Sequence, residues 1–379
     1  MERKIINILY IEDFLDPTTG GVQRVTMTLA NYLKDYGVNS FFCYSEFDYK
    51  PIGKKYKLQL NIHSDDINYI YNAILDFVIK NNISIIIVQD IAIKQIQYCL
   101  GRLRKEHDIK IIYCFHRNPI SSKQLSFNLY YRLKVQIYNF IYKIKPKYDF
   151  IDIIDAVDRY IVLSPSYIDA FKKEYKIFTN EKFEAIPNPV PFEPAALDLG
   201  SKEKTVLIIT RFQERVKNIK KAIDIWKYVE AKNKDWQLIV GGYGKDYEDV
   251  YNYFLKKKLR RCKFVGKVDN PKELYNKASI FMMTSRHEGY PMVLLEAMEY
   301  GCVPIVYDSF TSVHDIIENG KNGLIIKPYS TKKYIRGIIN LARNNNIREM
   351  IARNAYNTII NSNTKEAICL KWIELFKSL

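Results

Sequence analysis

The sequence has few cysteines, and none of them is spaced for a metal site. There is no CxxC pair and no cluster of histidine and cysteine at zinc spacing. Disulfides are rare in the cytosol, so we expect six reduced, mostly buried thiols. They are Cys43, Cys99, Cys114, Cys262, Cys302 and Cys369.

Long hydrophobic runs are also absent. The most aliphatic stretch, around residues 83–88, is far shorter than the roughly 20 residues that cross a bilayer. The first residues lack the apolar region of a signal peptide, so we expect a cytoplasmic protein. Hydrophobic residues make up 47% of the 379-residue chain. This composition can bury a core, and the length suits two domains.

Acidic residues are in deficit. The chain has 42 Asp and Glu against 58 Lys and Arg, which gives a formal net charge of +16. This balance predicts attraction to an anionic partner, which could be nucleic acid, a phospholipid surface or a phosphate-bearing substrate. Charge alone does not choose among the three.

Short β-branched runs alternate with helical patterns in both halves of the chain, which predicts parallel sheets covered by helices on both faces. Four prolines within residues 186–194 interrupt the alternation, and we interpret them as an interdomain linker. The sequence therefore predicts α/β domains over residues 1–187 and 188–362, followed by an amphipathic helix over 363–379. Ligands of such sheets bind at the carboxyl ends of the strands.

One segment of the second half combines a helix start with two glutamates. Pro291 and Gly301 mark the start and end of a helix, whose first N–H groups can bind a diphosphate. Glu288, in the preceding loop, can accept hydrogen bonds from sugar hydroxyls, and Glu296 can take two ribose hydroxyls. Without further context, such a pair would more often be a loop residue and a partner of the helix dipole.

The whole run from Glu288 to Pro304, E-G-Y-P-M-V-L-L-E-A-M-E-Y-G-C-V-P, resembles the donor-binding signature of the retaining glycosyltransferases of family 4. The resemblance implies the GT-B fold, in which two Rossmann-like domains face each other across a cleft and a C-terminal helix packs back toward the N-terminal domain. It also implies a set of donor-binding residues within the run: Glu288, Gly289, Tyr290, Pro291, Met292, Val293 and Glu296.

Further positions match the same family. The resemblance implies donor contacts at the glycine-rich loop with Gly20 and Gly21, at Asn188, at Gly242 and at Val265. It also implies that Arg211 and Lys217 hold the diphosphate oxygens. The family usually has one residue fewer between these two side chains, so Arg215 remains an alternative to Lys217 as the partner of Arg211.

The resemblance also implies the catalytic set, His116, Glu288, Arg211 and Lys217. His116 follows the strand expected over residues 109–115, where the family has a histidine that reaches the donor sugar. Retention without a nucleophile requires a leaving diphosphate held on the face that the acceptor attacks, and a diphosphate oxygen can take the acceptor proton. The chain has no DxD tripeptide, so we expect no metal, and no cofactor besides the nucleotide-sugar substrate.

The acceptor side is expected in the N-terminal domain. Residues 117–147 interleave tyrosines and aliphatic residues with basic ones and contain no acidic residue. Such a segment can lie on an anionic membrane surface, or it can be a solvated helix packed on its own domain. The first interpretation predicts a peripheral protein at the inner face of the membrane. After Arg117, the basic residues of the segment are Lys123, Arg132, Lys134, Lys143, Lys145 and Lys147.

Together these observations predict a retaining, metal-independent hexosyltransferase. It would move a sugar from a UDP- or GDP-linked donor to a glycan acceptor, lipid-linked in our hypothesis, in bacterial surface polysaccharide synthesis. A sugar-nucleotide epimerase or a phosphorylase of the same architecture is the alternative within enzymes. A nucleic-acid-binding protein is disfavoured because the basic residues are dispersed and no recognition motif is present.

Overall fold

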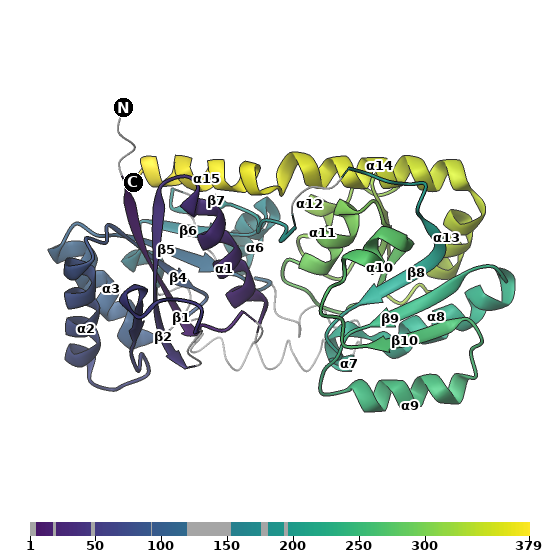
Figure 1. Cartoon of the computed structure of the whole chain (residues 1–379), viewed down its shortest axis with the longest axis horizontal. Coiled ribbons are helices and arrows are strands. Elements are labelled where there is room, and N and C mark those ends of the chain that lie inside the picture. Colours follow the sequence, from purple (N-terminus) through teal and green to yellow (C-terminus); the bar gives the residue numbers. More distant parts are fainter. Residues whose placement is uncertain are drawn as a thin grey trace. The chain divides into compact units, whose positions relative to one another are not determined.

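The computed structural model of the chain describes residues 5–17, 20–46, 50–91, 93–119, 153–175, 181–192 and 196–379. These residues form two compact units (Figure 1). The first contains the described residues up to Pro191 together with Lys365–Leu379, and the second contains those of Phe192–Thr364. The chain thus leaves the first unit between Pro191 and Phe192, whereas the sequence places the division between residues 187 and 188.

Tertiary contacts of residues 186–190 explain why the boundary between the two units lies after Pro191. The amide of Ile186 donates to the carbonyl of Val162 at 2.9 Å, and the Tyr32 hydroxyl donates to the carbonyl of Val190 at 3.3 Å. Ile186 and Val190 are both buried in the first unit. The proline-rich segment therefore begins as part of the first unit.

The first unit is a seven-stranded parallel sheet in the order β3-β2-β1-β4-β5-β6-β7. Every residue of the central strand β4 is buried, as expected for a strand covered on both faces. The strands are β1 (Ile6–Phe14), β2 (Val38–Glu46), β3 (Lys57–Gln59), β4 (Ile85–Gln89), β5 (Lys110–Phe115), β6 (Arg159–Val162) and β7 (Phe183–Ala185). The helices are α1 (Gly21–Lys34), α2 (Ile67–Lys80), α3 (Lys94–Glu106) and α6 (Pro165–Tyr175).

The C-terminal helix α15 (Lys365–Lys377) belongs to the first unit. Trp372 and Phe376 share a hydrophobic core with Tyr10 of β1 and Leu29 of α1. Lys365 adds an ion pair to Asp35, with 2.6 Å between Nζ and Oδ2. The expected return of the C-terminal helix to the N-terminal domain is confirmed.

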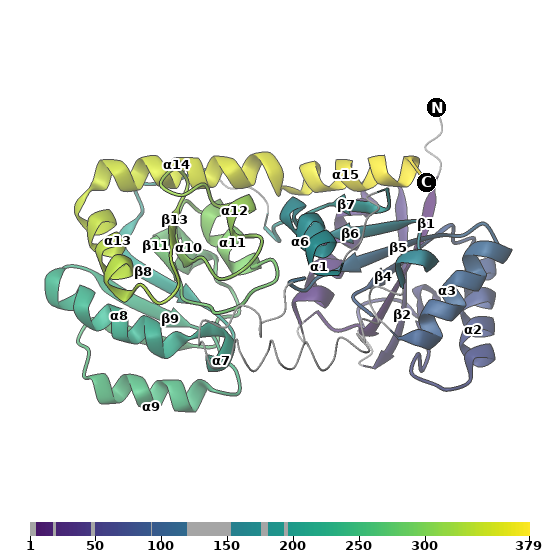
Figure 2. The ribbon, with the colours of Figure 1, turned by 180° about the vertical axis from the view of Figure 1, so that it is seen from behind.

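The second unit is a six-stranded parallel sheet in the order β10-β9-β8-β11-β12-β13, seen from behind in Figure 2. Trp226 and the apolar side chains of β8 and β11 lie in its core. The strands are β8 (Glu203–Ile209), β9 (Gln237–Gly241), β10 (Cys262–Gly266), β11 (Ala278–Met283), β12 (Val303–Tyr307) and β13 (Leu324–Ile326). The helices are α7 (Glu214–Lys217), α8 (Ile219–Lys232), α9 (Tyr247–Lys257), α10 (Lys272–Lys277), α11 (Met292–Glu299), α12 (Val313–Ile316), α13 (Thr331–Arg343) and α14 (Asn345–Ser362).

The α/β class with two Rossmann-like units is confirmed. All six cysteines are unpaired thiols, and all but Cys262 are buried, as the sequence predicts. The basic segment over residues 117–147 lies mostly outside the described residues. Within the described part of the chain, no helix is both long and apolar enough to span a membrane.

Candidate functional site

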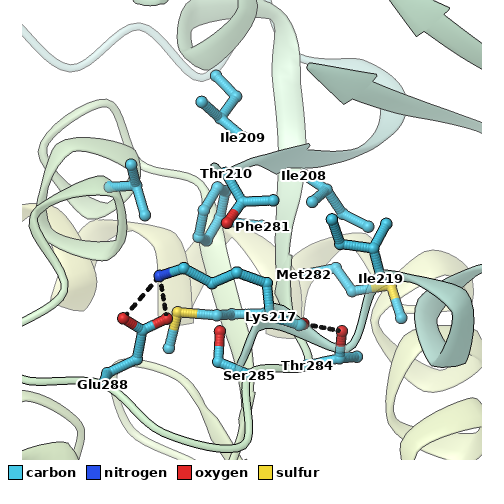
Figure 3. A pocket seen from close by; sticks show the side chains of 12 residues that line it. Ile208, Ile209, Thr210, Lys217, Ile219, Phe281, Met282, Thr284, Ser285 and Glu288 are labelled. Atoms are coloured by element: carbon cyan, nitrogen blue, oxygen red, sulfur yellow. Dashed lines mark hydrogen bonds and ion pairs between the residues drawn. The ribbon is translucent and has the colours of Figure 1, made fainter. Parts of the chain in front are cut away.

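A pocket of the second unit opens at the carboxyl ends of β8 and β11, the edge at which parallel sheets bind ligands (Figure 3). Lys217 and Glu288 are its charged lining residues, and apolar side chains of β8, β11 and α8 surround them. The lining residues are Ile208, Ile209, Thr210, Lys217, Ile219, Phe281, Met282, Met283, Thr284, Ser285, Glu288 and Val293.

Lys217 and Glu288 form an ion pair in this pocket. The Lys217 Nζ lies 2.8 Å from each carboxylate oxygen of Glu288 (Figure 3). The two side chains are only 17% and 9% exposed, so water screens the pair weakly. Arg215, the alternative to Lys217, has an exposed side chain and does not line this pocket.

A network that the sequence did not reveal fixes the short helix carrying Lys217. The Arg286 guanidinium donates to the carbonyls of Glu214 at 2.8 Å and Arg215 at 3.1 Å, and also to the Asn218 side-chain oxygen. Asn218 in turn donates from Nδ2 to the Thr284 carbonyl at 3.2 Å. The network ties the end of α7 to the loop after β11.

Asn218 has a left-handed backbone, with φ of +56°. Asparagine adopts this conformation more readily than most residues, and here it separates α7 from α8. An asparagine directly after Lys217 is therefore the feature of the sequence from which a sharp turn at this point could have been predicted.

Helix α11 begins one residue later than predicted. Pro291 precedes the helix as its N-cap, with ψ of 95°, and Met292 is the first helical residue. Gly301, with φ of +69°, follows its end as expected.

The first N–H groups of a helix have no partner within it, and no acidic residue occupies the first turn of α11. Val293, in that turn, lines the pocket, so this end of α11 can interact favourably with an anion.

The rest of the signature run is embedded in the second unit. Glu296 is 1% exposed and accepts a hydrogen bond from the Tyr275 hydroxyl at 3.0 Å. The Gly289 carbonyl accepts from Ser312 Oγ at 3.0 Å. Burial raises the pKa of Tyr290 to about 12, and its hydroxyl accepts from Asn363 Nδ2 at 3.2 Å. Glu296 does not line the described pocket, and its contact to ribose stays a prediction.

Three other predicted residues lie at the carboxyl ends of neighbouring strands. Arg211 follows β8 and is exposed, and Val265 lies in β10. Gly242 follows β9 with φ of +133°, and a Cβ there would come within 1.8 Å of the Thr210 carbonyl oxygen. Only glycine fits this position.

His116 and Asn188 line a second pocket, which lies in the first unit. His116 Nε2 is 2.6 Å from Gln89 Oε1. Burial lowers the pKa of His116 to about 4, so the imidazole is neutral at physiological pH. The structure thus brings two predicted residues together and adds Gln89 as the partner of His116.

Gly20 and Gly21 occupy the start of α1. Gly20 is extended, with φ of −162°, so a left-handed backbone is not the reason for a glycine at this position. A Cβ on Gly21 would meet nothing within 4 Å. Their predicted contact with the donor stays a prediction, and Thr18 and Thr19 of the same motif lie outside the described residues.

The comparisons with known proteins agree with this arrangement. Residues 190–358 match the family model described as glycosyl transferases group 1. The chain is 26% identical over 189 residues to the poly(glycerol-phosphate) alpha-glucosyltransferase of Bacillus subtilis, covering 48% of this chain and 28% of that protein. It is 27% identical over 175 residues to the amylovoran biosynthesis glycosyltransferase AmsD of Erwinia amylovora, covering 46% and 48%. The chain thus spans about half the length of these relatives or less.

Solved structures with the GT-B fold superpose on nearly the whole chain. Anabaena HepE in complex with UDP gives a TM-score of 0.76 at 14% identity, covering 99% of this chain and 100% of that one. Sucrose-phosphate synthase from Thermosynechococcus elongatus gives 0.75 at 17% identity, covering 98% of each chain. At such identities the likeness establishes the fold.

Proposed function

We propose, from the match of residues 190–358 to the glycosyl transferases group 1 model, that the chain transfers a sugar from a nucleotide-sugar to a glycan acceptor. The pocket with Lys217 and Glu288 carries the proposal. It places a cation, a carboxylate and the start of α11 at the carboxyl edge of one parallel sheet. A diphosphate suits the cation and the helix start, and sugar hydroxyls suit the carboxylate.

The ion pair is compatible with donor binding. An ammonium group carries three N–H donors, and Lys217 directs two of them to Glu288. The third can donate to a diphosphate oxygen. The two Glu288 oxygens retain acceptor capacity for sugar hydroxyls, so one residue pair can contact both parts of the donor.

We propose that the reaction proceeds with retention and without a metal. The bond between the anomeric carbon and the diphosphate oxygen breaks, the acceptor oxygen bonds to the same face, and the acceptor proton passes to a diphosphate oxygen. Lys217, Arg211 and the α11 start would stabilise the charge developing on the leaving group. His116, neutral because burial lowers its pKa to about 4, would exchange hydrogen bonds with a sugar hydroxyl.

The first test measures donor binding. UDP- and GDP-sugars are screened by the melting temperature of the pure protein, and the tightest binder should raise it most. A chain whose melting temperature responds to no nucleotide-sugar at millimolar concentration would contradict the proposal.

The second test measures turnover. Release of free nucleoside diphosphate should require a glycan acceptor, and the product should keep the anomeric configuration of the donor. An epimerase would convert the donor without releasing the nucleotide, and a phosphorylase would require phosphate. Turnover that disappears with EDTA and returns with manganese would refute metal independence.

We further propose a lipid-linked acceptor used in bacterial surface polysaccharide synthesis, at the inner face of the membrane. Support comes from the net charge of +16 and from relatives named as a poly(glycerol-phosphate) alpha-glucosyltransferase and an amylovoran biosynthesis glycosyltransferase. The chain should sediment with anionic vesicles at low salt and less with neutral ones. Equal recovery with both kinds of vesicle, or none with either, would count against it.

A further inference from the structure

Asp90 follows Gln89 at the end of β4 and connects this strand to the end of β5, the strand that precedes His116. Its amide donates to the Cys114 carbonyl of β5 at 2.9 Å. Its backbone is left-handed, with φ of +57°, a conformation that aspartate adopts more readily than most residues. Residues held in this conformation are frequent at functional sites. Asp90 thus joins two strand ends at the carboxyl edge of the sheet, beside His116.

An ion pair joins the Asp90 side chain to Arg117, the residue after His116. Arg117 Nε lies 3.0 Å from each carboxylate oxygen of Asp90. The Asp90 side chain is 13% exposed and the Arg117 side chain is 54% exposed, so the carboxylate is the more shielded partner. The Arg117 guanidinium also lies 5.5 Å from the centre of the Phe115 ring. Arg117 is thus held both to the end of β4 and to the residue before His116.

His116 is attached to the end of β4 in two ways. Gln89 Oε1 lies 2.6 Å from Nε2 of the imidazole and fixes the ring. Asp90 fixes the main chain on the C-terminal side of His116 through Arg117. Burial raises the pKa of Asp90 to about 6, against the opposing effects of Arg117 and of the His116 backbone amide. The carboxylate is therefore ionised at pH 8, where it retains its attraction to Arg117.

We propose that Asp90 is a positioning residue. Through its ion pair with Arg117, it holds the main chain of His116 in the place from which the imidazole reaches the donor sugar. The inference rests on the proposed function, because it assumes that His116 contacts the sugar during transfer. A displacement of about 1 Å at a reacting group can cost about 100-fold in rate, so a small movement of His116 should be visible in kcat.

The same unit contains a second pair of this kind, which provides a matched control. Asp158 accepts from Arg104 Nε at 2.8 Å and from the Ile111 amide of β5 at 2.8 Å, and its own amide donates to the Ile111 carbonyl at 2.8 Å. The Asp158 side chain is 16% exposed. Asp158 precedes β6, so it lies at the edge of the sheet opposite to His116. Loss of either pair should cost similar stability, whereas only loss of Asp90 should affect His116.

The experiment compares Asp90→Asn and Asp158→Asn with the wild type in transferase assays at pH 8. Asp90→Asn keeps the shape of the side chain and removes its charge, so kcat should fall about tenfold. The KM for the donor should change less than about threefold, because the diphosphate is proposed to bind in the second unit. Asp158→Asn should retain kcat within about twofold of the wild type. Melting curves establish that each variant is folded.

Combination with His116→Asn shows whether Asp90 acts through the histidine. In that background Asp90→Asn should change kcat by less than about twofold, because the imidazole that it positions is absent. A residue that acted independently of His116 would lower kcat by the same factor in both backgrounds. If Asp90→Asn does not fold, Arg117→Met tests the same pair from its more exposed side, with Arg104→Met as its control.

Three results would overturn the inference while leaving sugar transfer by the wild type intact. They are a kcat of Asp90→Asn equal to that of Asp158→Asn, an equal loss of kcat with and without His116, and an unchanged kcat in His116→Asn itself. A wild type that transfers no sugar from any nucleotide-sugar would overturn the proposed function and this inference together.

Discussion

The pockets of the two units differ in charge. In the second unit the pocket contains the ion pair of Lys217 and Glu288. In the first unit the pocket contains His116, which burial keeps neutral, hydrogen-bonded to the amide of Gln89. A pocket with fixed charges can stabilise a diphosphate, whereas neutral polar groups suit hydroxyls. The difference agrees with a donor site in the second unit and uncharged ligand groups in the first.

The largest effect should come from removing the cation of the second unit. Lys217→Met leaves Glu288 buried without this partner and would remove the stabilisation that we propose Lys217 gives to the leaving diphosphate. We expect kcat to fall about 100- to 1,000-fold. Lys220→Met is the matched control because its ion pair with Asp249 is more exposed, and it should retain nearly full activity. Equal activity of the two variants in steady-state assays would contradict the assigned role of Lys217.

The first unit contains a buried carboxyl group that the proposed reaction does not use. Both carboxylate oxygens of Glu12 are buried, and burial raises the pKa of this group from its ordinary value of 4.5 to about 8. Well below pH 4.5 the Glu12 carboxyl is protonated in both the folded and the unfolded chain, so its burial costs no free energy of ionisation. As the pH rises toward 8, the unfolded chain loses its proton first. Folding is therefore penalised by about 1.4 kcal/mol per pH unit, or roughly 3 kcal/mol at pH 7.

Replacing Glu12 by Gln removes this penalty. The variant should unfold at a higher temperature than the wild type at pH 7 to 8 and at the same temperature near pH 4.5. Glu46→Gln, at an exposed position in β2, should show no such pH dependence. A stability difference for Glu12→Gln that is constant with pH would rule out titration of the buried carboxyl as its cause.

An intermediate effect is expected at the network around α7. Arg286→Met removes the bonds to the carbonyls of Glu214 and Arg215, so Lys217 loses part of its support but remains in the chain. We expect kcat to fall about tenfold, with a loss of stability of about 2 kcal/mol. Arg343→Met, in the last turn of α13, serves as control. Unchanged kcat in a folded Arg286→Met protein would show that Lys217 functions without the hydrogen bonds from Arg286.

Local signals predicted the parts of the fold and site that depend on nearby residues. Pro291 and Gly301 located α11 to within one residue, and the ordered run that begins at Glu288 supplies two of the residues that line the pocket, Glu288 and Val293. The position of Val190 in the first unit depended instead on a hydrogen bond from Tyr32, 158 residues away in the sequence. The Arg286 network similarly joins segments about 70 residues apart. Such long-range contacts leave no periodicity in the sequence.

The smallest effect concerns the neutral pocket of the first unit. Since burial lowers the pKa of His116 to about 4, the imidazole should not titrate between pH 5 and 7, and kcat/KM should show no inflection from it in that range. Gln89→Glu places a carboxylate beside Nε2, now 2.6 Å from the Gln89 oxygen, and should raise the histidine pKa. The variant should therefore acquire an ionisation between pH 5 and 7, visible in its pH–rate profile and in the histidine NMR signal. Loss of that ionisation in Gln89→Glu combined with His116→Asn would assign it to His116. If the ionisation persists in the double variant, a group other than His116 titrates.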